Sequence, residues 1–143
     1  MDLERLAEKG NTLRLAVANL RRLVEMPETA FLGDRDKAAS LRYHIVLAAE
    51  AAVEIAGHLI SRRGFRAPRS YKDAIDVLHE EAVIEEAVRD AVRGLAGVRN
   101  LVVHRYWEVD DTRLRREIGT ALPLIEAFLA QVGSFIGADV SRR

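Results

Sequence analysis

The sequence has 143 residues and a mass of 16.0 kDa, which is the size of one domain. Apolar residues make up 49% of the chain and charged residues 31%, so it can bury a core, which excludes an intrinsically disordered protein. Acidic and basic side chains number 22 each, leaving no net charge to attract nucleic acid or an anionic membrane. We therefore expect a single domain over residues 1–143, in which any polyanion site is a local cluster of cations.

Cysteine is absent, which excludes disulfides, thiolate metal sites and cysteine nucleophiles. The first residues read Met-Asp-Leu-Glu-Arg-Leu and lack the apolar segment of a signal peptide. The most apolar stretch, residues 45–60, contains Glu50, Glu54 and His58 and is shorter than the about 18 to 20 residues of a membrane span. These features predict a soluble, cytoplasmic protein without a membrane span.

Apolar residues recur at steps of three and four, which is the spacing of one face of an α-helix. The first such stripe lies within residues 3–24, and the helix should stop before Pro27 because the residue before a proline disfavours helical geometry. A short connection over 26–33 follows, in which we expect Phe31 and Leu32 to be tucked against the core.

The next helix is predicted to be capped by the carboxylate of Asp34 or Asp36. Its stripe over 41–59 is flanked by further apolar residues, so this helix should be central and packed on more than one side. Gly, Pro and four arginines over 62–69 then predict a loop.

Ser70 followed by Asp73 resembles a capping box and predicts a short helix that ends near His79. A further helical stripe runs towards His104. The anionic side chains expected at its amino terminus are four glutamates: Glu80, Glu81, Glu85 and Glu86.

The last helical region is predicted to be capped by Asp110 or Asp111, and Pro123 should kink or split it near residues 120–122. No segment of useful length alternates with period two, so strands are not expected. The fold class is all-α, an antiparallel bundle of five or six helices.

Chemistry-bearing side chains gather at residues 98–107, which include Arg99, Asn100, His104 and Tyr106. On a helix Asn100 and His104 stack as an i, i+4 pair, while Arg99 lies well round the helix from His104. Three arrangements would bring the two groups together: a long Arg99 side chain reaching round, a helix that frays near His104, or a second subunit that supplies another copy of each.

Such a set can hold a phosphodiester through Arg99 and move protons through His104, because imidazole titrates near neutral pH. The alternative is structural, since a polar helix end in a bundle often uses Arg, Asn and His to satisfy backbone carbonyls.

The pattern of Arg99, Asn100, three apolar residues, His104, one residue and Tyr106 resembles the R-x4-H-x-Y signature of the HEPN superfamily, and specifically of the HepT toxins of toxin–antitoxin pairs. The order and length of the expected helices are similar as well, so the resemblance covers nearly the whole chain and implies a HEPN-like fold.

The resemblance implies a metal-independent endoribonuclease without a cofactor, active as a homodimer whose cleft cuts RNA by attack of the 2′-hydroxyl. Arg99 would bind and stabilise the phosphate, His104 would be the acid/base or phosphate-contacting group, and Asn100 would position them. Tyr106 matches the tyrosine on which a nucleotidyltransferase (MNT-type) antitoxin places AMP to silence HepT toxins.

Glu50, Glu54 and His58 form an i, i+4, i+8 ladder on the central helix. As metal ligands they match the usual di-iron pattern poorly. We therefore expect no metal there and interpret the ladder as a polar seam that pairs with arginines of a neighbouring helix, for example Arg89, Arg93 or Arg99, where a carboxylate could also orient Arg99.

Other polar and aromatic residues leave two interpretations open. The loop arginines, Arg62, Arg63, Arg66 and Arg69, could contact RNA phosphates or an acidic partner, or be solvated. Tyr71 and Trp107 could stack on a base or pack at helix ends, whereas His44 and His79 are expected to be structural.

Two rival functions remain open. One is a catalytically silent HEPN helical module that only binds a nucleotidyltransferase partner, and the other is a metal-carboxylate enzyme.

Overall fold

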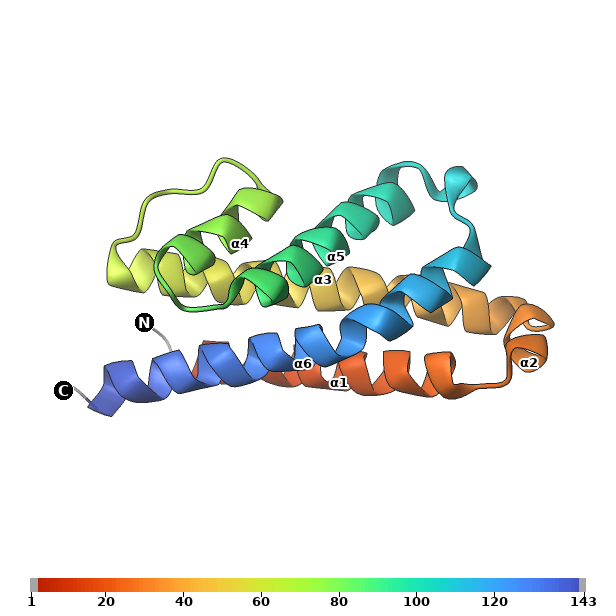
Figure 1. Ribbon diagram of the computed structural model, residues 1–143, viewed down its shortest axis with the longest axis horizontal. Helices are drawn as coiled ribbons and strands as arrows, with labels where there is room; N and C mark the ends of the chain where they lie inside the picture. The colour runs from red at the N-terminus through yellow and green to blue at the C-terminus, as the bar shows by residue number, and fades with distance from the viewer. Residues whose placement is uncertain (1–2, 142–143) are drawn as a thin grey trace.

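The computed structural model describes residues 3–141, which form six α-helices joined by short connections (Figure 1). Their bounds are Leu3–Glu25 for α1, Glu28–Leu32 for α2, Arg35–Arg63 for α3, Tyr71–Glu80 for α4, Glu86–His104 for α5 and Asp111–Ser141 for α6. A 3₁₀ turn, η1, spans Tyr106–Glu108. No strand occurs within residues 3–141, so the predicted all-α class is confirmed.

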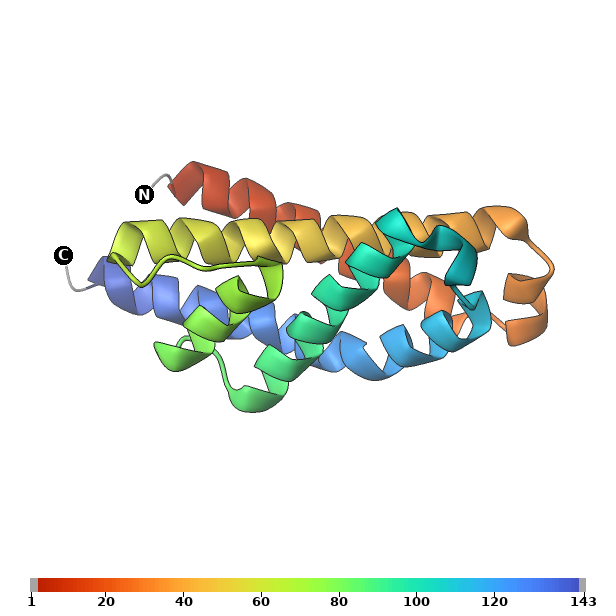
Figure 2. The same cartoon turned by 90° about the horizontal axis from the view of Figure 1, so that it is seen from above.

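Four long helices close a ring in which α1 contacts α3 and α6, and α5 contacts the same two helices from the other side. The chain runs in opposite directions along α1 and α3, and again along α5 and α6 (Figures 1 and 2). The short helix α4 lies against both α3 and α5. The predicted antiparallel bundle is therefore found, and α5 lies between α3 and α6.

The connection after α1 differs from its prediction. The helix ends at Glu25, before Pro27 as expected, but five residues of the following connection form α2. Phe31 is buried in the core, whereas the side chain of Leu32 is 54% exposed, so its predicted burial is wrong. Successive helical residues point about 100° apart, and only one of this pair can face α3.

Helix α3 is the central helix that the sequence predicts. Asp34 caps it, because its carboxylate accepts a hydrogen bond from the backbone N–H of Asp36 at 2.9 Å. Gly64 ends it in the left-handed conformation with φ 68°, which favours glycine. Between these ends α3 packs against α1, α4 and α5.

Two helices are long and apolar enough to pass a test for a membrane span based on length and composition, α3 and residues 111–140 of α6. The sequence predicts no membrane span, and passing this test is weak evidence for one. Core helices of water-soluble proteins pass the same test, and half of the α3 window is buried inside the bundle, against 22% of the α6 window. The apolar residues of α3 have protein neighbours in this fold, so its composition has a structural reason.

The start of α4 has the predicted cap, since Ser70 Oγ accepts a hydrogen bond from the backbone N–H of Asp73 at 3.1 Å. The Asp73 carboxylate accepts from the N–H of Arg69 at 2.9 Å, one residue earlier than an ideal capping box. The helix continues to Glu80. Glu80 and Glu81 thus lie at the end of α4 and not at the start of α5, contrary to the prediction.

Asp110 caps α6, because its carboxylate accepts hydrogen bonds from the N–H groups of Thr112 at 3.1 Å and Arg113 at 3.2 Å. Asp111 instead pairs with Arg42 of α3. Pro123 lies inside one continuous helix, so the predicted split is wrong. The ribbon of α6 bends part-way along its length (Figure 2), which is the milder of the two expected effects of an internal proline.

Candidate functional site

Arg99, on the last two turns of α5, is held by groups from three parts of the chain. Its Nη2 donates to Glu50 Oε1 of α3 at 3.1 Å, and its Nη1 donates to Asn100 Oδ1 at 3.1 Å. The ring of Tyr71, the first residue of α4, lies with its centroid 5.0 Å from Arg99 Cζ, within the range of a cation–π contact. The Arg99 side chain is only 17% exposed, and its Nε is buried without a hydrogen-bond partner.

His104 is the last residue of α5 and is exposed. Its imidazole makes no hydrogen bond or ion pair within residues 3–141, and none joins it to Arg99 or Asn100. Because α5 stays helical up to His104, the side chains of Arg99 and His104 leave the helix in different directions, as the sequence predicts. Within one chain, no hydrogen bond or ion pair joins the two candidate catalytic side chains among residues 3–141.

Tyr106 lies beyond the end of α5. Arg105 leaves helical geometry, with φ −139° and ψ 43°, and η1 begins at Tyr106. Tyr106 would lie on nearly the same side as Arg99 only if the helix continued to it, and α5 ends at His104. The backbone of the turn is fixed by Arg42, whose Nη1 donates to the Tyr106 carbonyl at 3.1 Å and whose other nitrogens hold Asp111 at 2.8 and 3.0 Å.

The side chains of the turn are open to solvent. Tyr106 is 61% exposed and Trp107 68%, and their rings meet edge to face at 5.3 Å. The phenol of Tyr106 has no hydrogen-bond partner within residues 3–141. The turn therefore exposes a phenol and an indole within three residues of His104 in the chain.

Two residues of the polar ladder of α3, Glu50 and Glu54, form ion pairs with neighbouring helices. Glu50 binds Arg99, as predicted, while Glu54 pairs with Lys9 of α1 at 2.7 Å. No group of metal-binding side chains occurs within the part of the chain that the structure describes. Of the three arginines named as alternative partners, Arg99 pairs with this ladder, whereas Arg89 and Arg93 pair elsewhere.

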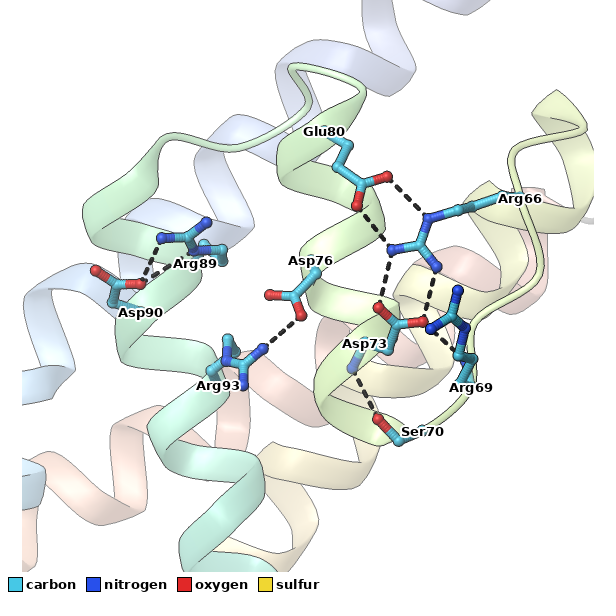
Figure 3. Close-up of polar contacts among 9 residues, drawn as sticks. All are labelled: Arg66, Arg69, Ser70, Asp73, Asp76, Glu80, Arg89, Asp90 and Arg93. Carbon is cyan, nitrogen blue, oxygen red and sulfur yellow. Dashed lines mark hydrogen bonds and ion pairs between the residues drawn. The ribbon is translucent and has the colours of Figure 1, made fainter.

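Those two arginines of α5 have other partners, which Figure 3 shows. Arg93 pairs with Asp76 of α4, and Arg89 with its neighbour Asp90 at 3.0 Å. The first of these pairs joins α4 to α5.

The loop arginine Arg66 is occupied by carboxylates of the chain itself. Its guanidinium donates to both oxygens of Asp73 at 2.7 and 2.8 Å and to both of Glu80 at 2.9 and 2.7 Å (Figure 3). These hydrogen bonds hold the pKa values of Asp73 and Glu80 below their usual range and raise the pKa of Arg66. Arg62 and Arg63 both pair with Asp139 of α6. Arg62 and Arg63 therefore join α3 to α6, and Arg66 joins the loop to α4.

His44 and His79 have backbone partners, as expected of structural residues. The Nδ1 of His44 lies 2.8 Å from the carbonyl of Ser40, and that of His79 lies 3.0 Å from the carbonyl of Ile84. A carbonyl only accepts, so each Nδ1 carries the proton.

A model of the family described as "Ribonuclease HepT-like" matches residues 13–132. The chain belongs to this family. The match covers most of α1 and extends into α6, so it contains Arg99, Asn100, His104 and Tyr106. The family that the R-x4-H-x-Y pattern indicates is thereby confirmed.

Two curated relatives are similar over part of the HepT-like chain. The mRNA nuclease HepT of Shewanella oneidensis is 30% identical over 61 residues, which are 43% of this chain and 46% of that protein. A protein of Archaeoglobus fulgidus named as a candidate RNase is 27% identical over 90 residues, 63% of this chain and 67% of that one. The matched segments thus span between about half and two thirds of these relatives.

Solved structures share the fold over nearly the whole chain. A cytosolic protein of unknown function, YutE from Bacillus subtilis, aligns with a TM-score of 0.86 and 20% identity, covering 97% of this chain and 93% of its own. A tri-AMPylated HEPN toxin of Shewanella oneidensis, in complex with an MNT antitoxin, aligns with a TM-score of 0.82 and 21% identity, covering 90% and 96%. At these identities the likeness shows the HEPN fold.

Proposed function

We propose that this chain is a metal-independent endoribonuclease and the toxin of a toxin–antitoxin pair. The observation that carries the proposal is an ordered guanidinium, Arg99, followed on the same helix by an exposed imidazole without a partner, His104, in a chain of the HepT-like ribonuclease family. An exposed histidine without contacts contributes little to folding, and its chemistry near neutral pH is that of a proton donor and acceptor.

The reaction needs only groups that such a site contains. Arg99 binds the scissile phosphate and stabilises the negative charge that grows on it. The 2′-hydroxyl attacks the adjacent phosphorus and the bond to the 5′-oxygen breaks, which leaves a cyclic phosphate and a free 5′-hydroxyl. One base takes the proton of the 2′-hydroxyl and one acid gives a proton to the leaving oxygen, and His104 fills one of these roles. Asn100 orients the Arg99 side chain through its Oδ1.

A homodimer supplies the missing connection between Arg99 and His104. The two groups do not meet within one chain, so a second subunit would complete the cleft with its own copies. An apolar groove of about 190 Å³ lies between α5 and α6 and is lined by Leu95, Val98, Ile118 and Ala121, among others. Light scattering that gives a monomer of 16.0 kDa at micromolar concentration would refute the dimer.

The regulation we propose is AMP addition to Tyr106 by a nucleotidyltransferase (MNT-type) antitoxin, in the cytoplasm. The exposed phenol of Tyr106 is accessible to a modifying enzyme, and an added phosphate and purine would block RNA by bulk and by charge. Intact-mass analysis after incubation with the cognate nucleotidyltransferase and ATP should give the adenylyl mass on the wild type and not on Tyr106→Phe. Adenylyl mass on both proteins, or on neither, would refute this assignment.

The test of the activity is cleavage of RNA by the purified chain in EDTA, with Arg99→Ala and His104→Ala beside the wild type. We expect cleavage by the wild type alone. A folded wild type without activity would favour the catalytically silent module that only binds a nucleotidyltransferase. Activity abolished by EDTA would favour a metal enzyme.

A further inference from the structure

The contacts of Arg99 suggest how its guanidinium is held for a phosphate. An arginine side chain is long and flexible, and a free one on a surface samples many rotamers. Arg99 is instead mostly buried, and two of its partners come from elements remote in sequence, Glu50 of α3 and Tyr71 of α4. Each Nη carries two N–H groups and donates one of them within the chain, so one on each remains for an outside acceptor.

The start of α4, which carries Tyr71, is held by a polar cluster of Arg66, Ser70, Asp73 and Glu80 (Figure 3). Tyr71 is the first residue of α4, directly after the cap residue Ser70. Arg66 bridges the first turn of this helix to its last, through Asp73 and Glu80. The Asp76–Arg93 pair joins α4 to α5, the helix that carries Arg99.

We propose that Glu50 and Tyr71 are positioning residues for Arg99, which fix its guanidinium in the place where the scissile phosphate binds. The proposal rests on the ribonuclease function proposed above. Glu50 supplies a fixed charge-assisted hydrogen bond, and the Tyr71 ring covers one face of the guanidinium. A preorganised cation stabilises a developing negative charge without reorganisation at the moment of reaction. The reaction rate therefore depends on where the guanidinium is held.

The chain offers a matched control for Glu50. Glu54 lies one turn further along the same helix and also makes one ion pair, with Lys9 of α1 instead of Arg99. Glu50→Ala and Glu54→Ala therefore remove the same side chain and the same charge from α3. Only the first releases Arg99.

The first measurement follows the Arg99 side chain itself. In a ¹⁵N-labelled protein, the Nε–H signal of Arg99 is assigned by its loss in Arg99→Lys, and its heteronuclear NOE reports how ordered the guanidinium is. We expect an ordered signal in the wild type and in Glu54→Ala, and a mobile one in Glu50→Ala. Glu50→Gln keeps an oxygen that accepts a hydrogen bond, and it should retain part of the order. Tyr71→Phe should keep the order, and Tyr71→Leu should reduce it.

The second measurement is RNA cleavage by the same variants. We expect kcat of Glu50→Ala to fall about 10- to 100-fold, as for a catalytic group displaced by about 1 Å, with Glu54→Ala close to the wild type. Glu50→Gln should recover part of the loss. Affinity for an uncleavable 2′-O-methyl RNA should change less than kcat, because a mobile guanidinium still attracts a phosphate.

The outcomes separate this inference from the proposed function. If the wild type cleaves RNA, Arg99→Ala does not, and Glu50→Ala equals Glu54→Ala, the positioning role is refuted and the ribonuclease stands. An Arg99 Nε–H equally ordered in Glu50→Ala and in the wild type also refutes it. If the wild type does not cleave RNA, the proposed function fails, and with it any catalytic role for Glu50 and Tyr71.

Discussion

Replacing His104 tests whether its imidazole acts in catalysis or stabilises the fold, because the two roles predict very different effects on cleavage rate and on stability. Its imidazole is exposed and has no partner within residues 3–141, so His104→Ala should change the free energy of unfolding by no more than about 0.5 kcal/mol. For a domain of this size that is a change in Tm of at most about 2 °C. Loss of a general acid or base, in contrast, should lower the cleavage rate by about 10²- to 10⁴-fold.

Val102 gives the opposite control from the same end of α5. It is buried, with 9% of its surface exposed, and it packs in the core two residues before His104. Val102→Ala should lower the stability by about 1–3 kcal/mol through lost packing, yet the folded protein should cleave RNA at nearly the wild-type rate.

Both variants are measured by thermal unfolding followed by circular dichroism and by initial rates of RNA cleavage well below Tm. A fall in Tm for His104→Ala as large as that for Val102→Ala would assign the imidazole to the fold. A cleavage rate that merely followed the folded fraction would contradict the catalytic role in the same way.

Further predictions concern packing, charge and RNA contact. A Cβ at Gly119 would lie 2.7 Å from Val24 Cγ1, whereas one at Gly133 of the same helix meets nothing within 4 Å. Gly119→Ala should therefore lower Tm. Gly133→Ala should stabilise the fold by about 1 kcal/mol, the usual gain in helix propensity, and so raise Tm. Equal changes in Tm for the two variants would contradict the close approach of α1 and α6. The depressed pKa values of the two carboxylate partners of Arg66 stabilise the fold above their ordinary range near about pH 4, and this contribution is lost as the pH falls through the depressed values. Arg66→Met should thus lower Tm at pH 7 and flatten its fall between about pH 5 and about pH 2, and an unchanged profile would refute the linkage. Trp107→Ala should weaken binding of single-stranded RNA by about 1–3 kcal/mol without lowering Tm, and unchanged binding in a fluorescence-anisotropy titration would exclude base stacking by the indole.

Features that depend on neighbouring residues could be predicted from the sequence. The stop before Pro27 and the Ser70 cap follow from local backbone geometry and hydrogen bonding. Where the sequence allowed two choices, as for Asp110 and Asp111, the tertiary contact decided, because Arg42 engages Asp111 and leaves Asp110 to cap α6.

The surroundings of Arg99 could be predicted only in part. The i, i+4 ladder of α3 indicated a seam facing arginines, but periodicity does not fix how two helices slide along each other, and Arg89, Arg93 and Arg99 remained equivalent. The contact with Tyr71 joins residues 28 positions apart across a loop, and no local pattern indicates it. The position of Tyr106 depends on the non-helical backbone at Arg105, which the helical periodicity does not indicate.

The distribution of ion pairs bears on where RNA would bind. With no net charge and many arginines paired to carboxylates of the same chain, attraction for a polyanion has to be local. Arg99 is itself paired with Glu50, so the field at the site is weaker than its residue types suggest. A fixed guanidinium with spare N–H donors can still recognise one phosphate by geometry, where a diffuse basic surface would select only for charge. The exposed rings of Tyr106 and Trp107 can then contribute contacts that do not depend on charge, which suits unpaired bases and not a duplex.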